Sequence, residues 1–237
     1  MVDLHTHILF DIDDGPKAID ESLSLLNKAT QSGVTTFVTT SHYYSARTPF
    51  ADFVSKRNAR FESLRKACAE QELPVRLLRG AEIHIDPLLL NQPDFHDLCF
   101  EGTNHALLEI QHSATQLEEA LLLIDRIMSY FNVVPIIAHV ERYPFLRKMR
   151  NLAKLRELGC FIQIDAECLL GSFFDRRFAF MALEAGYVDV IASDCHDTIK
   201  RPPNLADAYA VVDKRCGTEA VQRLQKNAKR LVFPNKA

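Results

Sequence analysis

The chain has 237 residues, of which 47% are hydrophobic and 25% charged, and its formal net charge is −3. The slight negative charge argues against a general nucleic acid binder and gives no reason to expect attraction to an anionic membrane. No apolar run approaches the roughly 20 residues of a membrane-spanning helix, and no basic segment followed by an apolar one opens the chain as a signal peptide would. We therefore expect a cytoplasmic protein without membrane insertion.

Short apolar strands alternate with amphipathic helices along the chain. Such alternation predicts a mostly parallel sheet covered by helices, and we expect one α/β domain over residues 1–237, as a barrel of seven strands. In chain order the predicted elements are a strand at 2–9, a helix at 19–32, a strand at 34–40, a helix at 50–71, strands at 75–83 and 106–110, a helix at 114–130, a strand at 133–138, a helix at 145–158, a strand at 161–164, a helix at 174–185, a strand at 188–192, and helices at 205–214 and 219–231.

The first strand carries His5 and His7, two residues apart. Residues at this spacing on a strand point to the same face, so both imidazoles would aim at one point. Imidazole is the commonest metal-binding side chain near neutral pH, and core packing does not call for such a pair. Asp194 and His196 repeat the spacing after the last strand. The two pairs indicate a metal site.

Other strands end in single candidate ligands, and loops at the carboxyl ends of barrel strands form active sites. A lone strand-end histidine is more often structural or solvated, and Glu82 and Glu109 could be surface carboxylates. Each glutamate, however, ends an apolar strand, where an unpaired buried charge is costly. Together the candidate ligands are His5, His7, Asp14, His42, Glu82, Glu109, His139, Asp194 and His196. We assign no chemistry to four further histidines, in expected helical or loop contexts: His84, His96, His105 and His112.

Six stretches carry these residues in order over almost the whole chain. They are DLHTHILFDIDDGPK at the start, TTSHY, GAEIH, LLEI, IIAHVERY, and IASDCHDTIKRPP near the end. The pattern resembles the PHP (polymerase and histidinol phosphatase) superfamily and, more closely, the bacterial CpsB/CapC-type metal-dependent tyrosine-protein phosphatases. The segments DIDDGPK and AHVERY favour this subgroup over histidinol phosphatases.

The resemblance implies a distorted (β/α)7 barrel, a PHP-type TIM-like barrel, with up to three divalent ions. Imidazole and carboxylate ligands suit manganese, iron or zinc, and the family favours manganese. Asp13 is left as an alternative to Asp14. The implied ligand sets are His5, His7, Glu82 and Asp194 for one ion, Glu82 as a bridge with Glu109 and His139 for a second, and Asp14, His42 and His196 for the third.

The implied reaction is hydrolysis of a phosphoric monoester, in which metal-activated hydroxide attacks phosphorus. Arg142 lies three residues after His139 and Arg201 five after His196, and both match the family's active-site arginines. Their guanidinium groups suit phosphate oxygens, although either could instead pair with a surface carboxylate. Tyrosinate is a fairly good leaving group, and no dedicated acid stands out. The resemblance implies a phosphotyrosine-bearing protein as substrate, namely the tail of a bacterial tyrosine kinase of capsule or exopolysaccharide synthesis.

Three alternatives remain at this point. A small-molecule phosphoesterase of the same superfamily would share the metal site, and a non-catalytic module would lack activity. The third is a cysteine phosphatase, because Cys195 to Arg201 formally matches Cys-x5-Arg. Such a loop must aim backbone N–H groups at phosphate and lead into a helix, but this one has no glycine and two prolines follow it. The six cysteines form no Cys-x-x-Cys pair and predict buried thiols in a reducing compartment.

Overall fold

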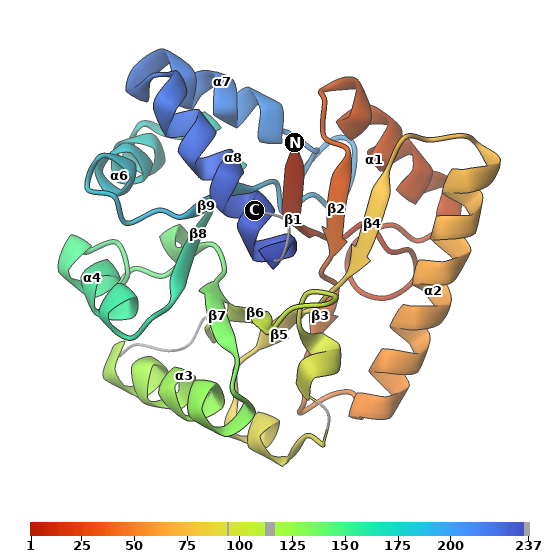
Figure 1. The fold of residues 1–237 in the computed structure, drawn as a ribbon, viewed down its shortest axis with the longest axis horizontal. Helices are drawn as coiled ribbons and strands as arrows, with labels where there is room; N and C mark the ends of the chain where they lie inside the picture. The colour runs from red at the N-terminus through yellow and green to blue at the C-terminus, as the bar shows by residue number, and fades with distance from the viewer. Residues whose placement is uncertain (94, 112–116, 235–237) are drawn as a thin grey trace.

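The computed structural model describes residues 1–93, 95–111 and 117–234, and its strands form two parallel sheets that together curl into a barrel. Every ladder among the described strands is parallel. Figure 1 shows the strands in a ring with most helices outside it. The strands are β1 (Val2–Thr6), β2 (Thr36–Thr39), β3 (His42–Tyr43), β4 (Arg76–Arg79), β5 (Glu82–His84), β6 (His105–Glu109), β7 (Val134–Ile137), β8 (Phe161–Asp165) and β9 (Val190–Ala192).

Eight of the nine described strand segments overlap the seven predicted strands, and β3 lies just after the predicted strand at 34–40. Strands that hydrogen-bond to one another form two runs. The first run has the order β1-β2-β4, and the second has the order β3-β5-β6-β7-β8-β9. The predicted strand at 75–83 is interrupted at Gly80 and Ala81, and Thr40 and Ser41 likewise separate β2 from β3. Each interruption moves the chain from one run to the other, which distorts the barrel. The fold is the predicted distorted (β/α)7 barrel.

The barrel closes between β9 and β1. Thr6 forms a parallel bridge with Cys195. The backbone N–H of His7 donates to the carbonyl of Cys195 at 2.9 Å, and the N–H of Asp194 donates to the carbonyl of His5 at 2.9 Å. Closure therefore brings the first and last strand ends together, where the two histidine-containing pairs lie.

A bulge in β1 directs the first two histidines. Between Asp3 and Thr6, β1 carries one more residue than the paired part of β2. An extra residue in one strand turns the following side chains to the other face. Leu4 packs in the barrel interior with residues of the other strands, and His5 and His7, beyond it, also point into the barrel.

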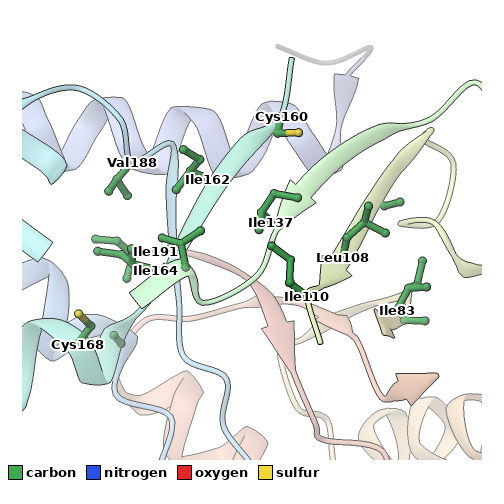
Figure 2. Close-up of a cluster of buried hydrophobic side chains, with 14 of the residues drawn as sticks. Ile83, Leu108, Ile110, Ile137, Cys160, Ile162, Ile164, Cys168, Val188 and Ile191 are labelled. Atoms are coloured by element: carbon green, nitrogen blue, oxygen red, sulfur yellow. The ribbon is translucent and has the colours of Figure 1, made fainter. Parts of the chain in front are cut away.

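Apolar side chains fill both faces of the sheet. On the outer face, under the helices, one residue from each of several neighbouring strands packs into a continuous layer, as Figure 2 shows for Leu108, Ile137, Ile162 and Ile191. The interior is closed at the amino ends of the strands by α8, whose Leu231 joins the interior cluster. Among the described residues, α8 therefore covers the amino end of the barrel and leaves the carboxyl end uncovered by this helix.

The helices follow the predicted order with two exceptions. The predicted helix at 145–158 begins only at Met149, because Tyr143 to Leu146 form a turn whose Leu146 N–H donates to Tyr143. The short helix after β8 was not predicted. Of the predicted helix at 114–130, residues 114–116 lie outside the described residues, as does His112. The helices are α1 (Ile19–Gln31), α2 (Phe50–Glu70), α3 (Leu117–Phe131), α4 (Met149–Glu157), α5 (Ala166–Leu170), α6 (Phe173–Glu184), α7 (Leu205–Cys216) and α8 (Thr218–Val232), with 3-10 turns at Pro87–Asn91, Phe95–Leu98 and Val140–Arg142.

Among the described residues, none of the helices combines the length and the apolar character needed to cross a bilayer.

Candidate metal centre

The structure brings all nine candidate ligands together at the carboxyl end of the barrel, and we refer to these nine residues as the candidate metal centre. Parallel strands deliver them to one edge although they are distant in sequence. They come from β1 and the loop after it (His5, His7, Asp14), from β3 (His42), β5 (Glu82) and β6 (Glu109), and from the segments after β7 (His139) and β9 (Asp194, His196).

Two of these ligands have left-handed backbone conformations. His139 has a φ of 32° and Asp194 a φ of 51°. Such conformations cost residues other than glycine roughly 1–3 kcal/mol and gather at functional sites. Asp194 is held in place by the hydrogen bond to His5 that closes the barrel, so the fold offsets this strain.

The tightest group contains His5, His7, Glu82 and Asp194, all buried. Nε2 of His5 lies 3.2 Å from Nε2 of His7, 3.2 Å from Oε2 of Glu82 and 3.3 Å from Oδ1 of Asp194. Nε2 of His7 lies 3.1 Å from the same glutamate oxygen and 3.3 Å from the same aspartate oxygen. Ligands about 2.0–2.2 Å from one shared ion lie about 3.0–3.5 Å from each other. The spacing therefore fits one divalent cation.

Glu82 links this group to its neighbours. Its Oε1 lies 2.6 Å from Nε2 of His139, and its Oε2 lies 3.0 Å from Nδ1 of His42. A carboxylate whose two oxygens face different imidazoles can bridge two ions. The geometry agrees with the bridging role that the resemblance implies.

Glu109 lies at the outer side of the group that it forms with Glu82 and His139, the set implied for a second ion. Its Oε1 is 3.9 Å from Nε2 of His139, and its Oε2 is 3.9 Å from Nδ1 of His42. Nδ1 of His84 lies closer, 3.2 Å from the same Oε2. The expected helical or loop context was wrong for His84, which lies on β5 and faces the site, and for His105, which lies on β6. For His84, the spacing of two residues from Glu82 was the available signal.

The third group gathers around Asp14. Its Oδ1 lies 3.1 Å from Nε2 of His196 and 3.6 Å from Nε2 of His42. One ligand atom from each of these three residues and from His7 lies within 4.8 Å of the others. The exposed carboxylate of Asp14 places this group nearest to solvent.

The neighbouring Asp13 has a different position. Its Oδ2 lies 2.8 Å from Nδ1 of His7 and accepts a hydrogen bond of 3.0 Å from the backbone N–H of His42. A carboxylate that binds the second nitrogen of a ligating imidazole fixes its tautomer and orientation. The geometry favours Asp14 as the ligand and Asp13 as the residue that orients His7.

Gly15 makes this arrangement sterically possible. A Cβ atom at Gly15 would lie 2.2 Å from the carbonyl oxygen of His7. Its backbone N–H also donates to Oδ1 of Asp13 at 3.0 Å. The Asp-Asp-Gly segment can therefore fold back onto β1 only with glycine at its third position.

The electrostatics of the centre favour a cation. Burial disfavours the protonated imidazole of His5, but the carboxylates of Glu82 and Asp194 outweigh burial and raise the pKa of His5 to about 9. The imidazole of His196 lowers the pKa of Asp14 to about 2, which keeps that carboxylate ionised. The raised pKa of His5 shows a negative potential that a divalent ion would neutralise, and the lowered pKa of Asp14 keeps an anionic donor available to such an ion.

Buried ligand atoms without hydrogen bonds also fit a metal. Among the described residues, thirteen buried side-chain nitrogen or oxygen atoms make no hydrogen bond, and four of them belong to the candidate metal centre: Nδ1 of His42, Oε2 of Glu82, Oδ1 of Asp194 and Nε2 of His196. Buried polar atoms are normally hydrogen-bonded, and each exception needs a reason. For these four atoms, cations placed among them would supply it.

Strand β8 contributes no candidate ligand but supports several. Oε1 of Gln163 lies 3.3 Å from Nδ1 of His5 and accepts a hydrogen bond of 2.8 Å from the backbone N–H of His139. Its amide nitrogen donates to Asp165 at 2.9 Å, and Asp165 in turn contacts Arg142 at 2.6 Å. Neither Gln163 nor Asp165 was predicted as a site residue. Gln163 lies within an otherwise apolar strand, and the position of Asp165 at the strand end was the available signal.

The two predicted arginines meet at one carboxylate oxygen. Nη2 of Arg142 and Nη2 of Arg201 both donate to Oδ2 of Asp194, whose other oxygen faces the histidines. Arg201 also lies 3.5 Å from Asp14 through Nη1. Both guanidinium groups therefore border the candidate metal centre.

A cavity of about 470 Å³ opens beside the centre, and we refer to it as the site pocket. Four of its lining residues were absent from the predicted site: Tyr44, Arg47, His84 and Gln111. The site pocket is lined by Asp14, His42, Tyr44, Arg47, His84, Glu109, Gln111, Arg142 and Arg201.

Cys195 does not face this pocket. Its side chain is buried in the outer hydrophobic layer, and burial, with a smaller contribution from Asp3, raises the pKa of its thiol to about 12. A nucleophilic cysteine needs a lowered pKa and access to substrate. The structure therefore excludes the cysteine phosphatase reading, and all six cysteines are free thiols.

Comparison with known proteins identifies the family. The sequence matches the family model for capsular polysaccharide synthesis, CpsB/CapC, over residues 1–233. The chain is 30% identical to tyrosine-protein phosphatase CpsB of Streptococcus pneumoniae over 244 residues, covering 94% of each protein. It is 27% identical to tyrosine-protein phosphatase YwqE of Bacillus subtilis over 236 residues, covering 98% of this chain and 91% of YwqE.

A solved structure agrees with these matches. It comes from work on YwqE from Bacillus subtilis and CpsB from Streptococcus pneumoniae, described as unique metal-dependent tyrosine phosphatases, and superposes with a TM-score of 0.88 at 26% identity. The superposition covers 98% of this chain and 94% of that one. The chain belongs to the CpsB/CapC family of capsular polysaccharide synthesis proteins.

Proposed function

We propose that this protein is a metal-dependent protein-tyrosine phosphatase, which hydrolyses phosphotyrosine to tyrosine and phosphate. The observation that carries the proposal is the contact of Arg142 and Arg201 with Asp194, a member of the tightest ligand group. This arrangement places two guanidinium groups beside a cation site, as binding of a phosphate dianion requires. The tyrosine phosphatase names of the relatives support the same activity.

We propose the nine residues of the candidate metal centre as ligands for up to three divalent ions, with Asp13 outside the set. The mixed imidazole and carboxylate donors suit manganese, iron or zinc, and manganese is the expected metal because the family resemblance favours it. Divalent ions bound there would supply activated water and neutralise charge on the phosphate. Glu82 would be shared between ions, since both of its oxygens face imidazoles.

The arginines would bind the phosphate. Among the described residues, the ion pairs of Arg142 run through Nη2 alone, to Asp165 and Asp194. Its remaining N–H groups can therefore donate to phosphate oxygens while Asp165 holds the side chain in place. Arg201, held between Asp194 and Asp14, can do the same from the other loop. Because tyrosinate leaves readily, no dedicated general acid is assigned.

A metal-dependence experiment tests the proposed function. The purified protein is stripped with EDTA, metal loss is confirmed by elemental analysis, and manganese is then added back. We expect activity on a phosphotyrosine peptide to disappear and return. The variant His7→Ala, which removes a proposed ligand of the tightest group, should fail to recover, whereas His96→Ala, at an exposed histidine outside the candidate metal centre, should recover fully. Full activity after confirmed metal loss would contradict the mechanism.

A substrate panel separates the alternatives. We expect the manganese-loaded protein to hydrolyse a phosphotyrosine peptide faster than a phosphoserine peptide or histidinol phosphate. Preference for histidinol phosphate would favour a small-molecule phosphoesterase. Metal binding without hydrolysis of any of the three would favour a non-catalytic module.

Three finer expectations accompany this proposal. The substrate would be the phosphorylated tail of a bacterial tyrosine kinase in capsule or exopolysaccharide synthesis. The protein would act in the cytoplasm, where its six free thiols stay reduced. Residues 1–237 would act as one domain, since all described strands join one barrel.

A further inference from the structure

The site pocket contains a third arginine that differs from the other two. Arg142 and Arg201 both pair with carboxylates of the protein. Arg47 is exposed, and it forms no ion pair with any residue in the described ranges, although it lines the same pocket. Of the three arginines that line the pocket, Arg47 is therefore the one whose charge is not neutralised by a carboxylate of the described residues.

A tight turn holds Arg47 at the pocket. The carbonyl of Tyr44 accepts hydrogen bonds of 3.0 Å from the backbone N–H groups of both Arg47 and Thr48. The side chain of Ser45, within this turn, donates to Asp86, which lies after β5. Two anchors thus fix the turn, and a preorganised group loses less entropy when it binds a ligand.

The ring of Tyr44 supports the guanidinium. The Cζ of Arg47 lies 4.7 Å from the centre of this ring, within the range of a cation–π contact. The ring centre is also 5.4 Å from that of His42 and 5.1 Å from that of His84. Tyr44 therefore stands between Arg47 and the candidate metal centre, and separates the arginine from the phosphate site.

We propose that Arg47, supported by Tyr44, binds a carboxylate of the substrate peptide next to the phosphotyrosine. The inference rests on the proposed function and concerns the substrate class of the same site. The phosphate already has two arginines and the cation site, whereas Arg47 lies behind an aromatic ring at the exposed wall. An acidic side chain flanking the phosphotyrosine would give this guanidinium the anionic partner that the protein does not supply.

The test compares two phosphotyrosine peptides that differ only in having Glu or Gln on both sides of the phosphotyrosine. An exposed ion pair contributes up to about a fivefold preference, so wild type should show kcat/KM about fivefold higher for the Glu peptide. Arg47→Ala should reduce this ratio to about one. Arg47→Glu should reverse it when Lys replaces Gln in the second peptide. Arg150→Ala, at an exposed arginine of α4, should keep the wild-type ratio.

Three outcomes would overturn the inference. A wild-type ratio near one shows no acidic preference, and an unchanged ratio in Arg47→Ala assigns the preference to the general field of the site. Equal losses on both peptides, with the ratio kept, assign Arg47 to the phosphate instead. Phenyl phosphate, which has no carboxylate, serves as the reference substrate. If metal-loaded wild type hydrolyses neither it nor the peptides, the proposed function itself fails.

Discussion

The side-chain oxygen of Gln163 lies 3.3 Å from Nδ1 of His5, so the opposite nitrogen of that ring points into the candidate metal centre. The same oxygen accepts a hydrogen bond from the backbone N–H of His139. One buried amide on β8 thus orients a side chain from β1 and the left-handed segment after β7. Residues that bind the second nitrogen of a ligating imidazole often matter nearly as much as the ligand.

Replacing Gln163 by Met, which keeps the volume but removes the acceptor, should weaken metal binding about 10- to 100-fold. His5 would lose the partner that fixes its tautomer. The His139 N–H would lose its buried acceptor, at a cost of about 1–3 kcal/mol, which should lower the Tm by several degrees. Metal titration and thermal unfolding of the stripped protein measure the two effects.

The exposed Gln222→Met provides the matched control and should change neither quantity. If Gln163→Met bound manganese with wild-type affinity, the amide would have no role in orienting His5. A fall in Tm alone would assign Gln163 to stability only.

The sequence predicts those parts of the fold that depend on local pattern. The helix predicted at 50–71 is observed at Phe50–Glu70, since its apolar spacing and the flanking residues are read within a single segment. The strand end that carries Glu109 was predicted for the same reason, whereas Glu82 begins β5 after the interruption at Gly80 and Ala81 and does not end a continuous strand. The helix predicted from residue 145 begins later because a turn, which periodicity does not report, comes first.

The supporting residues depend on contacts distant in sequence. Gln163 reaches His5 across 158 residues, through barrel closure that no local motif encodes. The bulge that turns His5 and His7 inward depends on how β1 pairs with β2. His84 was set aside for a similar reason, since only the pairing of β5 with β6 brings it to Glu109.

Arg201→Ala should lower kcat/KM for a phosphotyrosine peptide roughly 100-fold and leave the metal content unchanged. The guanidinium contacts Asp194 from outside the tightest ligand group, and that aspartate also keeps its contact with Arg142. Elemental analysis and steady-state kinetics measure the two effects. Loss of metal in this variant would instead show that Arg201 holds Asp194 in place.

Asp165→Asn should act through Arg142. The substitution keeps the side-chain shape but removes the charge that contacts Nη2 of Arg142 at 2.6 Å. A charge-assisted hydrogen bond is about twice as strong as a neutral one, so we expect about a tenfold loss in kcat/KM, mainly through a higher KM. In the double variant with Arg142→Ala, the Asp165 substitution should have little further effect. Additive losses would contradict a shared role.

Gly15→Ala should disrupt the loop that carries Asp13 and Asp14. The added Cβ would lie 2.2 Å from the carbonyl oxygen of His7, so the loop must move away from β1. We expect weaker metal binding, measured by titration, together with lower stability. Gly186→Ala is the matched control, because Gly186 has a φ of +73° but no atom within 4 Å of an added Cβ. It should lower stability without changing metal affinity, and equal metal affinities in the two variants would refute the explanation.

Cys195→Ala should keep activity on a phosphotyrosine peptide within about threefold of wild type. The thiol is buried in the outer hydrophobic layer and does not face the pocket, and a metal-dependent reaction does not use it. Removing one buried sulfur costs about 1–2 kcal/mol of stability, so the Tm should fall by a few degrees. Treatment of the native protein with iodoacetamide should leave Cys195 unmodified, because the raised pKa and burial keep the thiolate scarce, and mass spectrometry checks this directly. A loss of more than about 100-fold in Cys195→Ala, with its metals retained, would restore the cysteine mechanism.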